Sequence, residues 1–399
     1  MRCEMPATLP RASDPGRVDA ALLCGSLDGG GAERVMIALA NGLAADGHRV
    51  DLVLLCGPGP RDGEVSSAVR VVPLRASRPA LGAGAFLHYL RRESPRAVLA
   101  TLVGPNAMAV ACARLLPASR RPRVVVREAN TLSVALRYRS HPARLLAGAI
   151  ARAAYPHADA IIAVSEGARA DLSRFLGLPN ERVIAVANPA PTAAVVARSR
   201  EPLAHPWFAS DRAVPLLVAA GRLVPKKGFD VLLEAVAALG PRRAVRLVVM
   251  GVGPEHAALD RQIDRLGLRG RAELAGYVDN PFSRLGRADL FVLSSLAEGM
   301  PNALLEAMAC GCPVVATDCP SGPREILRDG RDGILVPPGD SVALAAAIDE
   351  ALTSPPDRAA LRARAADFDG SVAVGAYARV LGLGKRAGHP AREVGKLRL

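Results

Sequence analysis

Two glutamates at a fixed spacing are the strongest chemical signal in the sequence. Glu298 follows a short apolar run at residues 290–293, and Glu306 stands about two helical turns further on. Between them Pro301 is typical of a first helical turn, and Gly311 marks the end of the same helix. We therefore expect Glu298 in a loop above a strand end and Glu306 on the inward face of the helix.

The start of this helix could itself bind a ligand. Its first backbone N–H groups, near Gly299, Met300 and Asn302, have no partner within the helix and could bind an anion or a hydroxyl-rich ring. The alternative is that Glu298 only caps the helix and that Glu306 is a solvated helix glutamate. Taken singly, the two residues leave both interpretations open.

Two cations have a spacing suited to a polyanion. Arg222 follows the strand expected at residues 216–221, and Lys227 stands five residues later, at the entry to the helix expected over 228–239. Both side chains could converge above the strand end, where Arg offers a planar fork for phosphate oxygens and Lys a point charge. The alternative is a pair of solvated loop cations.

A run of glycines, Gly29, Gly30 and Gly31, lies between the first expected strand and the first expected helix. Glycines at such a turn allow a ligand to approach the backbone closely at the positive end of the helix. A simple flexible turn is the alternative.

These residues require a framework, and the hydrophobic pattern supplies one. A strand at 19–26, a helix at 32–46 and a strand at 50–56 begin an alternation that predicts an α/β fold, with parallel sheets covered by helices on both faces. The alternation is lost over residues 189–214, which we interpret as an interdomain linker, and restarts at 216–221. We therefore expect two doubly wound, Rossmann-like domains that face each other across a cleft.

Composition excludes several classes of protein. The formal net charge is +13, yet only 3% of residues are aromatic and no nucleic-acid-binding motif is present, so no nucleic-acid partner is expected. Seven scattered cysteines lack disulfide or metal spacing, which indicates no metal site and a reducing, cytoplasmic environment. Glu4 and several prolines argue against a signal peptide. The longest uncharged run, 97–113, is too short and too interrupted to span a bilayer.

The positive charge is concentrated in two segments. Residues 129–158 contain four arginines and no acid, interspersed with leucines, and residues 383–399 contain five Lys or Arg against one Glu. Such a stretch is usually a solvated face, but it could also contact anionic lipid headgroups. We expect a peripheral contact with an anionic membrane as the alternative to plain solvation.

The motifs together resemble glycosyltransferase family 4, whose members are retaining nucleotide-sugar transferases with the two-domain GT-B fold. The resemblance rests on the Glu pair followed by Ala-Met-Ala-x-Gly-x-Pro-Val-Val-Ala, and on Gly-Arg-Leu-x-x-x-Lys-Gly-Phe-Asp at 221–230. It extends to Gly-Gly-Gly-Ala-Glu-Arg at 29–34, Ala-Val-Ser-Glu-Gly at 163–167 and Asn-Pro at 188–189. The second half matches closely and the first half in pieces.

The resemblance implies domains and roles. Residues 1–200 would form the acceptor-side domain and 201–382 the nucleotide-sugar-binding domain, whose last helix could pack back on the first domain; 383–399 would be a basic tail. Arg222 and Lys227 would hold the donor diphosphate, and Glu306 the ribose. The donor sugar would contact Glu298 and the backbone of 299–302.

The resemblance also implies that Gly30 and Gly31 lie near the donor phosphates. No metal or cofactor is expected, because two cations and helix termini can stabilise the leaving diphosphate. The expected reaction transfers a hexose from a nucleotide sugar, with UDP as carrier, to a hydroxyl acceptor. That acceptor would be a lipid-linked or cell-surface polysaccharide intermediate, at the inner face of the cell membrane.

One part of the sequence departs from the family. Many members place a His near the end of the fifth strand, whereas this chain has Arg127, Glu128 and Asn130 in that place. Glu128 or Asn130 could replace the His in contacting the acceptor or the donor sugar. Alternatively, Glu128 is a structural partner of Arg127.

Two other functions remain open. A GT-B sugar-nucleotide epimerase would isomerise the donor without an acceptor. A non-catalytic GT-B adaptor would be expected to have lost the Glu pair or the Arg/Lys pair, and all four residues are present.

Overall fold

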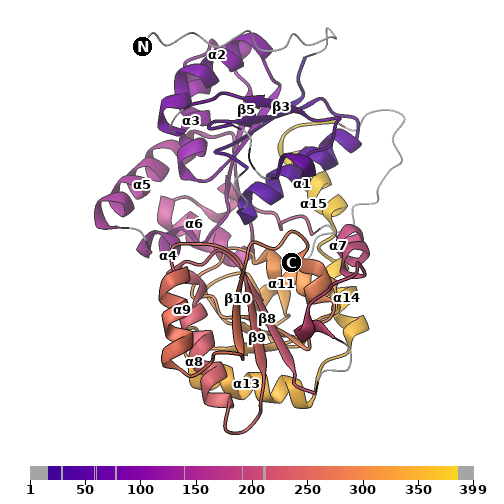
Figure 1. Ribbon diagram of the computed structural model, residues 1–399. Coiled ribbons are helices and arrows are strands. Elements are labelled where there is room, and N and C mark those ends of the chain that lie inside the picture. The colour runs from indigo at the N-terminus through magenta and orange to yellow at the C-terminus, as the bar shows by residue number, and fades with distance from the viewer. Residues whose placement is uncertain are drawn as a thin grey trace, which may run out of the picture.

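The computed structural model describes residues 17–27, 30–57, 59, 61–76, 79–138, 140–190, 192–209 and 213–384. Gly29, most of the basic tail and the residues around Glu4 lie outside these ranges. Two α/β domains are stacked on each other, the earlier part of the chain in one and the later part in the other (Figure 1).

The first domain is built on a seven-stranded parallel sheet with the order β3-β2-β1-β4-β5-β6-β7. Strands such as β1 and β4 are buried along their whole length, because helices cover both faces. The strands are β1 Ala20–Cys24, β2 Val50–Leu54, β3 Arg70–Pro73, β4 Ala97–Thr101, β5 Arg123–Glu128, β6 Ala160–Ala163 and β7 Val183–Ala185. The helices are α1 Gly31–Ala45, α2 Ala83–Glu93, α3 Val103–Arg114, α4 Leu132–Arg137, α5 His141–Ala154 and α6 Glu166–Leu176.

The second domain repeats this topology with six parallel strands in the order β10-β9-β8-β11-β12-β13. The strands are β8 Leu216–Ala220, β9 Arg246–Met250, β10 Ala272–Gly276, β11 Leu290–Leu293, β12 Val314–Thr317 and β13 Ile334–Val336. The helices are α8 Phe229–Leu239, α9 His256–Arg265, α10 Pro281–Leu285, α11 Asn302–Ala309, α12 Pro323–Ile326, α13 Ser341–Thr353 and α14 Arg358–Ala366. The strand order reverses between β8 and β11, and ligands of such sheets bind at the carboxyl ends of the strands at that point.

The prediction of two doubly wound parallel sheets is therefore confirmed. The segment at 189–214, expected to be an interdomain linker without regular structure, contains the helix α7, Thr192–Ser199. This helix packs on α10 and α11 of the second domain. The prolines at 191 and 202 flank this helix and do not interrupt it.

The last described helix, α15 Gly370–Val380, returns to the first domain and packs against α1 (Figure 1). Val374 lies against Gly42 of α1, and the Arg123 side chain at the start of β5 donates a 2.8 Å hydrogen bond to the Val380 carbonyl. Tyr377 is fully buried among first-domain residues. The chain thus crosses between the domains twice.

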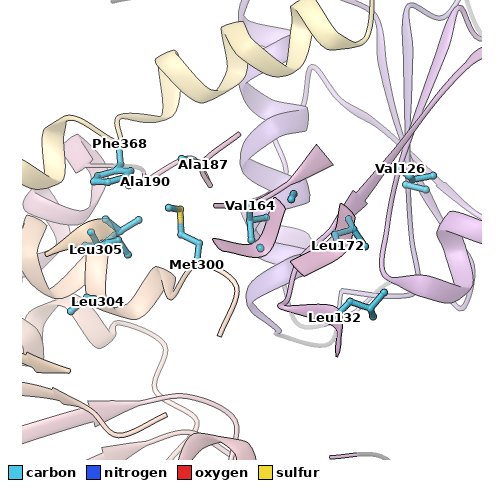
Figure 2. Close-up of a cluster of buried hydrophobic side chains, with 14 of the residues drawn as sticks. Val126, Leu132, Val164, Leu172, Ala187, Ala190, Met300, Leu304, Leu305 and Phe368 are labelled. Atoms are coloured by element: carbon cyan, nitrogen blue, oxygen red, sulfur yellow. The ribbon is translucent and has the colours of Figure 1, made fainter. Parts of the chain in front are cut away.

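A continuous apolar cluster also joins the two domains. Met300, from the loop before α11, lies between Val164 and Ala187 of the first domain and Leu305 of the second (Figure 2).

Within the described residues no helix is both long and apolar enough to cross a membrane.

Candidate active site

The loop after β8 places three cations at the switch point of the second sheet. Pro225–Lys227 forms one 3₁₀ turn that ends at Gly228, whose φ is +58°. A Cβ at Gly228 would lie 2.2 Å from the Ser294 carbonyl oxygen, so only glycine allows this loop to pack on the loop after β11. The Ser294 hydroxyl donates a 2.9 Å hydrogen bond to the Lys227 carbonyl and joins the two loops.

Lys227 and Glu298 form an ion pair across these loops. The Lys227 ammonium donates to Glu298 Oε1, which also accepts a 2.6 Å hydrogen bond from the Ser295 hydroxyl. Burial raises the pKa of Glu298, but the charges of Lys227 and Lys226 and these hydrogen bonds outweigh it, so that the pKa lies below its ordinary value. Glu298 is therefore an anion whose main partner is Lys227.

The other two cations differ in their surroundings. Arg222 is exposed, and its guanidinium has no hydrogen bond or ion pair within the described ranges. Lys226 reaches the first domain, where it donates a 3.1 Å hydrogen bond to the Asn130 side-chain oxygen. Lys226 was missed in the sequence, where its only signal is its position beside Lys227.

The loops that carry Asn130 and Glu298 are in direct contact. Asn130 and Gly299 form an isolated antiparallel bridge, and the Thr131 hydroxyl donates a 2.6 Å hydrogen bond to the Glu298 carbonyl. A Cβ at Gly299 would lie 2.5 Å from the Ala129 carbonyl oxygen, so this approach also requires glycine. The first domain thus supplies one wall of the site around Glu298.

Glu128 lies behind Asn130, inside the first domain. Its carboxylate accepts hydrogen bonds from the Tyr155 hydroxyl, at 2.9 Å, and from the Asn130 backbone N–H, at 3.3 Å. Burial raises its pKa. Arg127 forms no ion pair with Glu128, because its guanidinium donates to side-chain oxygens of other residues, Thr101, Asn188 and Tyr377. Of the two alternatives for Glu128, a direct ion pair with Arg127 is not formed, although the Arg127 charge acts on Glu128 and lowers its pKa against the larger effect of burial. Glu128 instead holds the loop that presents Asn130.

Glu306 faces the first domain from the second turn of α11. Its carboxylate pairs with Arg34 of α1 at 2.6 Å, and Glu306 is the main cause of the raised pKa of that arginine. The phenol of Tyr277, in the loop after β10, also acts electrostatically on Arg34. Arg34 was not singled out in the sequence, although it ends the Gly-Gly-Gly-Ala-Glu-Arg motif.

Asn302 connects the helix start to the Gly-rich loop. Its side-chain N–H donates a 3.4 Å hydrogen bond to the Gly31 carbonyl, and its oxygen accepts one of 2.7 Å from Asn188. Gly30 precedes α1 in extended conformation. Met300 has its side chain buried between the domains, so that only its backbone remains to contact a ligand.

The sequence-predicted site residues therefore come from both domains and surround one interdomain region. Over the part of the chain that the structure describes, no group of three or more His, Cys, Asp or Glu side chains is placed to hold a metal ion.

Comparison with known proteins supplies the family. A model of Glycosyltransferase Family 4 matches residues 29–194, and one of Glycosyl transferases group 1 matches residues 214–354. The lipopolysaccharide core biosynthesis glycosyltransferase LpsE of Rhizobium meliloti is 30% identical over 363 residues, which covers 88% of this chain and 92% of LpsE. The chain belongs to glycosyltransferase family 4.

A further relative is an enzyme of Campylobacter jejuni. This enzyme, N-acetylgalactosamine-N,N'-diacetylbacillosaminyl-diphospho-undecaprenol 4-alpha-N-acetylgalactosaminyltransferase, is 29% identical over 216 residues, 54% of this chain and 56% of that enzyme.

Solved structures agree with the fold. HepE from Anabaena, in complex with UDP-glucose, superposes with a TM-score of 0.74 at 22% identity over 91% of this chain and 99% of HepE. Sucrose-phosphate synthase from Thermosynechococcus elongatus superposes with a TM-score of 0.73 at 20% identity, over 92% of this chain and 96% of the synthase. The expected GT-B fold is confirmed.

Proposed function

We propose that this family 4 member transfers a hexose from a UDP-sugar to a hydroxyl acceptor, with retention at the anomeric carbon. The observation that carries the proposal is the group of three cations, Arg222, Lys226 and Lys227, at the carboxyl end of β8, beside the anionic Glu298. The likeness to a UDP-glucose-bound fold supports a UDP carrier.

Electrostatic stabilisation of the departing diphosphate would be the main contribution of the site. Arg222, exposed and unpaired within the described residues, offers a bidentate fork, and Lys227 is already oriented by Glu298. The diphosphate oxygen would accept the proton of the attacking hydroxyl on the same face of the sugar, as the family's retaining mechanism implies. Glu298 and the backbone of 299–302 would bind the sugar hydroxyls.

Glu306 would accept hydrogen bonds from the ribose hydroxyls. In the structure its carboxylate contacts Arg34, so a bound ribose would share this carboxylate with Arg34 or displace it. Gly30 and Gly31 would face the donor phosphates at the start of α1.

A lipid-linked or cell-surface polysaccharide intermediate is the proposed acceptor class. LpsE functions in lipopolysaccharide core biosynthesis, and the Campylobacter enzyme is named for a diphospho-undecaprenol acceptor. Residues 1–200 would form the acceptor side, with Asn130 facing the acceptor or donor sugar, and 201–382 the donor side. The proposed place of the reaction is the cytoplasmic face of the membrane, which the scattered spacing of the seven cysteines supports.

A thermal-shift panel of nucleoside diphosphates and their sugars tests the proposal. A bound donor stabilises the folded state by mass action, so UDP or a UDP-sugar should raise the melting temperature. The shift should disappear in Lys227→Met and persist in Arg114→Gln, an exposed arginine of α3 remote from the cleft. A panel without any shift would contradict the proposal.

Product analysis separates the other functions. Transfer to a hydroxyl acceptor supports the proposed reaction, while isomerisation of the UDP-sugar without an acceptor would indicate an epimerase. Donor binding with neither reaction, over a panel of lipid-linked acceptors, would favour the adaptor.

A further inference from the structure

A pocket of about 260 Å³, lined by none of the candidate site residues, lies between α4, α5 and α6 of the first domain. Arg137, Arg144 and Arg152 contribute to its wall, together with the apolar side chains of Leu145 and Phe175. In Figure 1, α5 stands at the outer side of the first domain, and α4 lies close to the junction of the two domains.

The positive charge of this pocket is not neutralised by the chain. Arg137 and Arg144 form no ion pair and no side-chain hydrogen bond within the described ranges. Arg152 donates to the Phe175 carbonyl and stacks 4.1 Å from the centre of the Phe175 ring, so it has no anionic partner either. The nearby Asp171 accepts hydrogen bonds from the Ser133 backbone N–H and hydroxyl at the start of α4, so one carboxylate stands against three arginines. The pocket can therefore accept an external anion.

Apolar side chains project beside these arginines. Leu145 and Leu146 of α5 are 57% and 63% exposed, and Tyr138, directly after α4, is 41% exposed. Two adjacent exposed leucines on a helix that also carries unpaired arginines are typical of a helix lying at a lipid–water interface. A free phosphate ion would use the arginines but would leave the leucines without a partner.

We propose that this pocket binds the phosphate of an anionic phospholipid headgroup, with Leu145 and Leu146 entering the adjoining acyl boundary. The surface would thereby hold the enzyme against the membrane. The choice of a membrane rests on the exposed leucines and on the proposed lipid-linked acceptor, whereas the anion site itself rests on the three arginines.

The position of α4 connects this surface to the active site. Thr131, which directly precedes α4, donates its hydroxyl to the Glu298 carbonyl, and Arg137 ends the same helix six residues later. At 1.5 Å per residue the two positions are about 9 Å apart along the axis. A membrane docked at the pocket would therefore lie beside the loop that presents Asn130.

Co-sedimentation of the full chain with vesicles tests the proposal. We expect binding to phosphatidylglycerol-containing vesicles, little binding to pure phosphatidylcholine, and a decrease at high salt. Arg137→Gln/Arg144→Gln should weaken the binding about 25-fold, at about fivefold per arginine near an anionic surface. The basic residues of 385–399 are present in every variant, so the comparison isolates the pocket.

Matched controls use residues elsewhere on the first domain. Arg114→Gln/Arg120→Gln removes two exposed arginines that also lack side-chain partners in the described part of the chain, and should leave the binding unchanged. Leu145→Ser/Leu146→Ser should weaken it, whereas Leu81→Ser/Leu115→Ser, at 67% and 66% exposure, should not. Circular dichroism verifies that each variant folds.

Three outcomes would overturn the proposal. One is equal vesicle binding by the wild type and Arg137→Gln/Arg144→Gln, and another is equal binding to neutral vesicles. The third is a stabilisation by inorganic phosphate that requires these two arginines while vesicles do not bind, which would make the pocket a free-phosphate site. The UDP thermal shift, measured on the same variants, reports donor binding separately, so failure here is distinguishable from failure of the proposed function.

Discussion

The Lys227–Glu298 ion pair can be tested by replacing its members one at a time and together. The two side chains are 17% and 9% exposed, so Lys227→Met leaves a nearly buried carboxylate without its main counter-charge. Breaking a fully buried pair costs about 3–5 kcal/mol; because Lys226 and Ser295 still act on Glu298, we expect about 2–3 kcal/mol. For a domain of roughly 180 residues this lowers the melting temperature by about 5–10 °C.

The cost of Lys227→Met should depend on pH in a defined direction. In the wild type the pKa of Glu298 is lowered, so the stability from its charge is present above the unfolded-state pKa and is lost as the pH falls through the folded-state value. Without Lys227, burial dominates and raises that pKa. The variant then loses stability as the pH rises through the raised value. The difference between the two proteins should therefore grow as the pH rises from the lowered pKa of the wild type to the raised pKa of the variant.

Thermal unfolding of Lys227→Met, Glu298→Gln and the double variant across this pH range provides the measurement. The double variant removes both charges, so it should recover most of the lost stability while its transferase activity stays absent. Arg222→Met, which removes an exposed cation, serves as the control for stability. Additive losses in the double variant, or a cost of Lys227→Met that does not change with pH, would refute the ion pair.

Three further predictions follow from the site. Arg222→Ala should change the free energy of unfolding by less than about 0.5 kcal/mol, because the side chain is exposed. It should nevertheless weaken UDP binding at least tenfold in calorimetry, since hydrogen bonds to charged groups contribute about 1.5–3 kcal/mol. The wild type should lose stability as the pH rises through the raised pKa of the Glu128 carboxyl, and Glu128→Gln should abolish this loss, as measured by urea unfolding at several pH values. Gly299→Ala should lower turnover, because the added methyl group pushes the loop away from the Ala129 carbonyl oxygen. Gly63→Ala, with open space around the added Cβ, should leave turnover unchanged. Equal activities of the two variants would contradict the close approach at Gly299.

The sequence predicted the sheets well because the signal for them is local. A parallel strand covered on both faces is a continuous apolar run in the sequence, as in β4. The loops after β8 and β11 contain Gly228 and Gly299, at positions where a Cβ would clash with a neighbouring carbonyl oxygen. Arg222, Lys227 and Glu298 could be placed together for the same reason, since they follow neighbouring strands of one sheet.

Contacts between the domains could not be predicted in this way. Arg34 and Glu306 are 272 residues apart, and Lys226 and Asn130 are 96 apart. Each contact depends on how two separately folded sheets pack against each other, which no local period encodes. The return of α15 to the first domain is likewise encoded by no local period, and only the family resemblance implied it.

Arg127 explains why the return of α15 to the first domain matters for the site. This guanidinium is fully buried and donates to the Tyr377 hydroxyl of α15 and, at 2.5 Å, to the side-chain oxygen of Asn188. With its oxygen engaged, Asn188 must present its N–H groups to the second domain, where they reach the Met300 carbonyl and the Asn302 oxygen. Asn302 is then left with its own N–H groups directed at the Gly-rich loop. A buried cation without acceptors is costly, so Arg127 depends on both Tyr377 and Asn188. The hydrogen bonds of Arg127 and Asn188 thereby join α15, the end of the first domain and the start of α11 into one network.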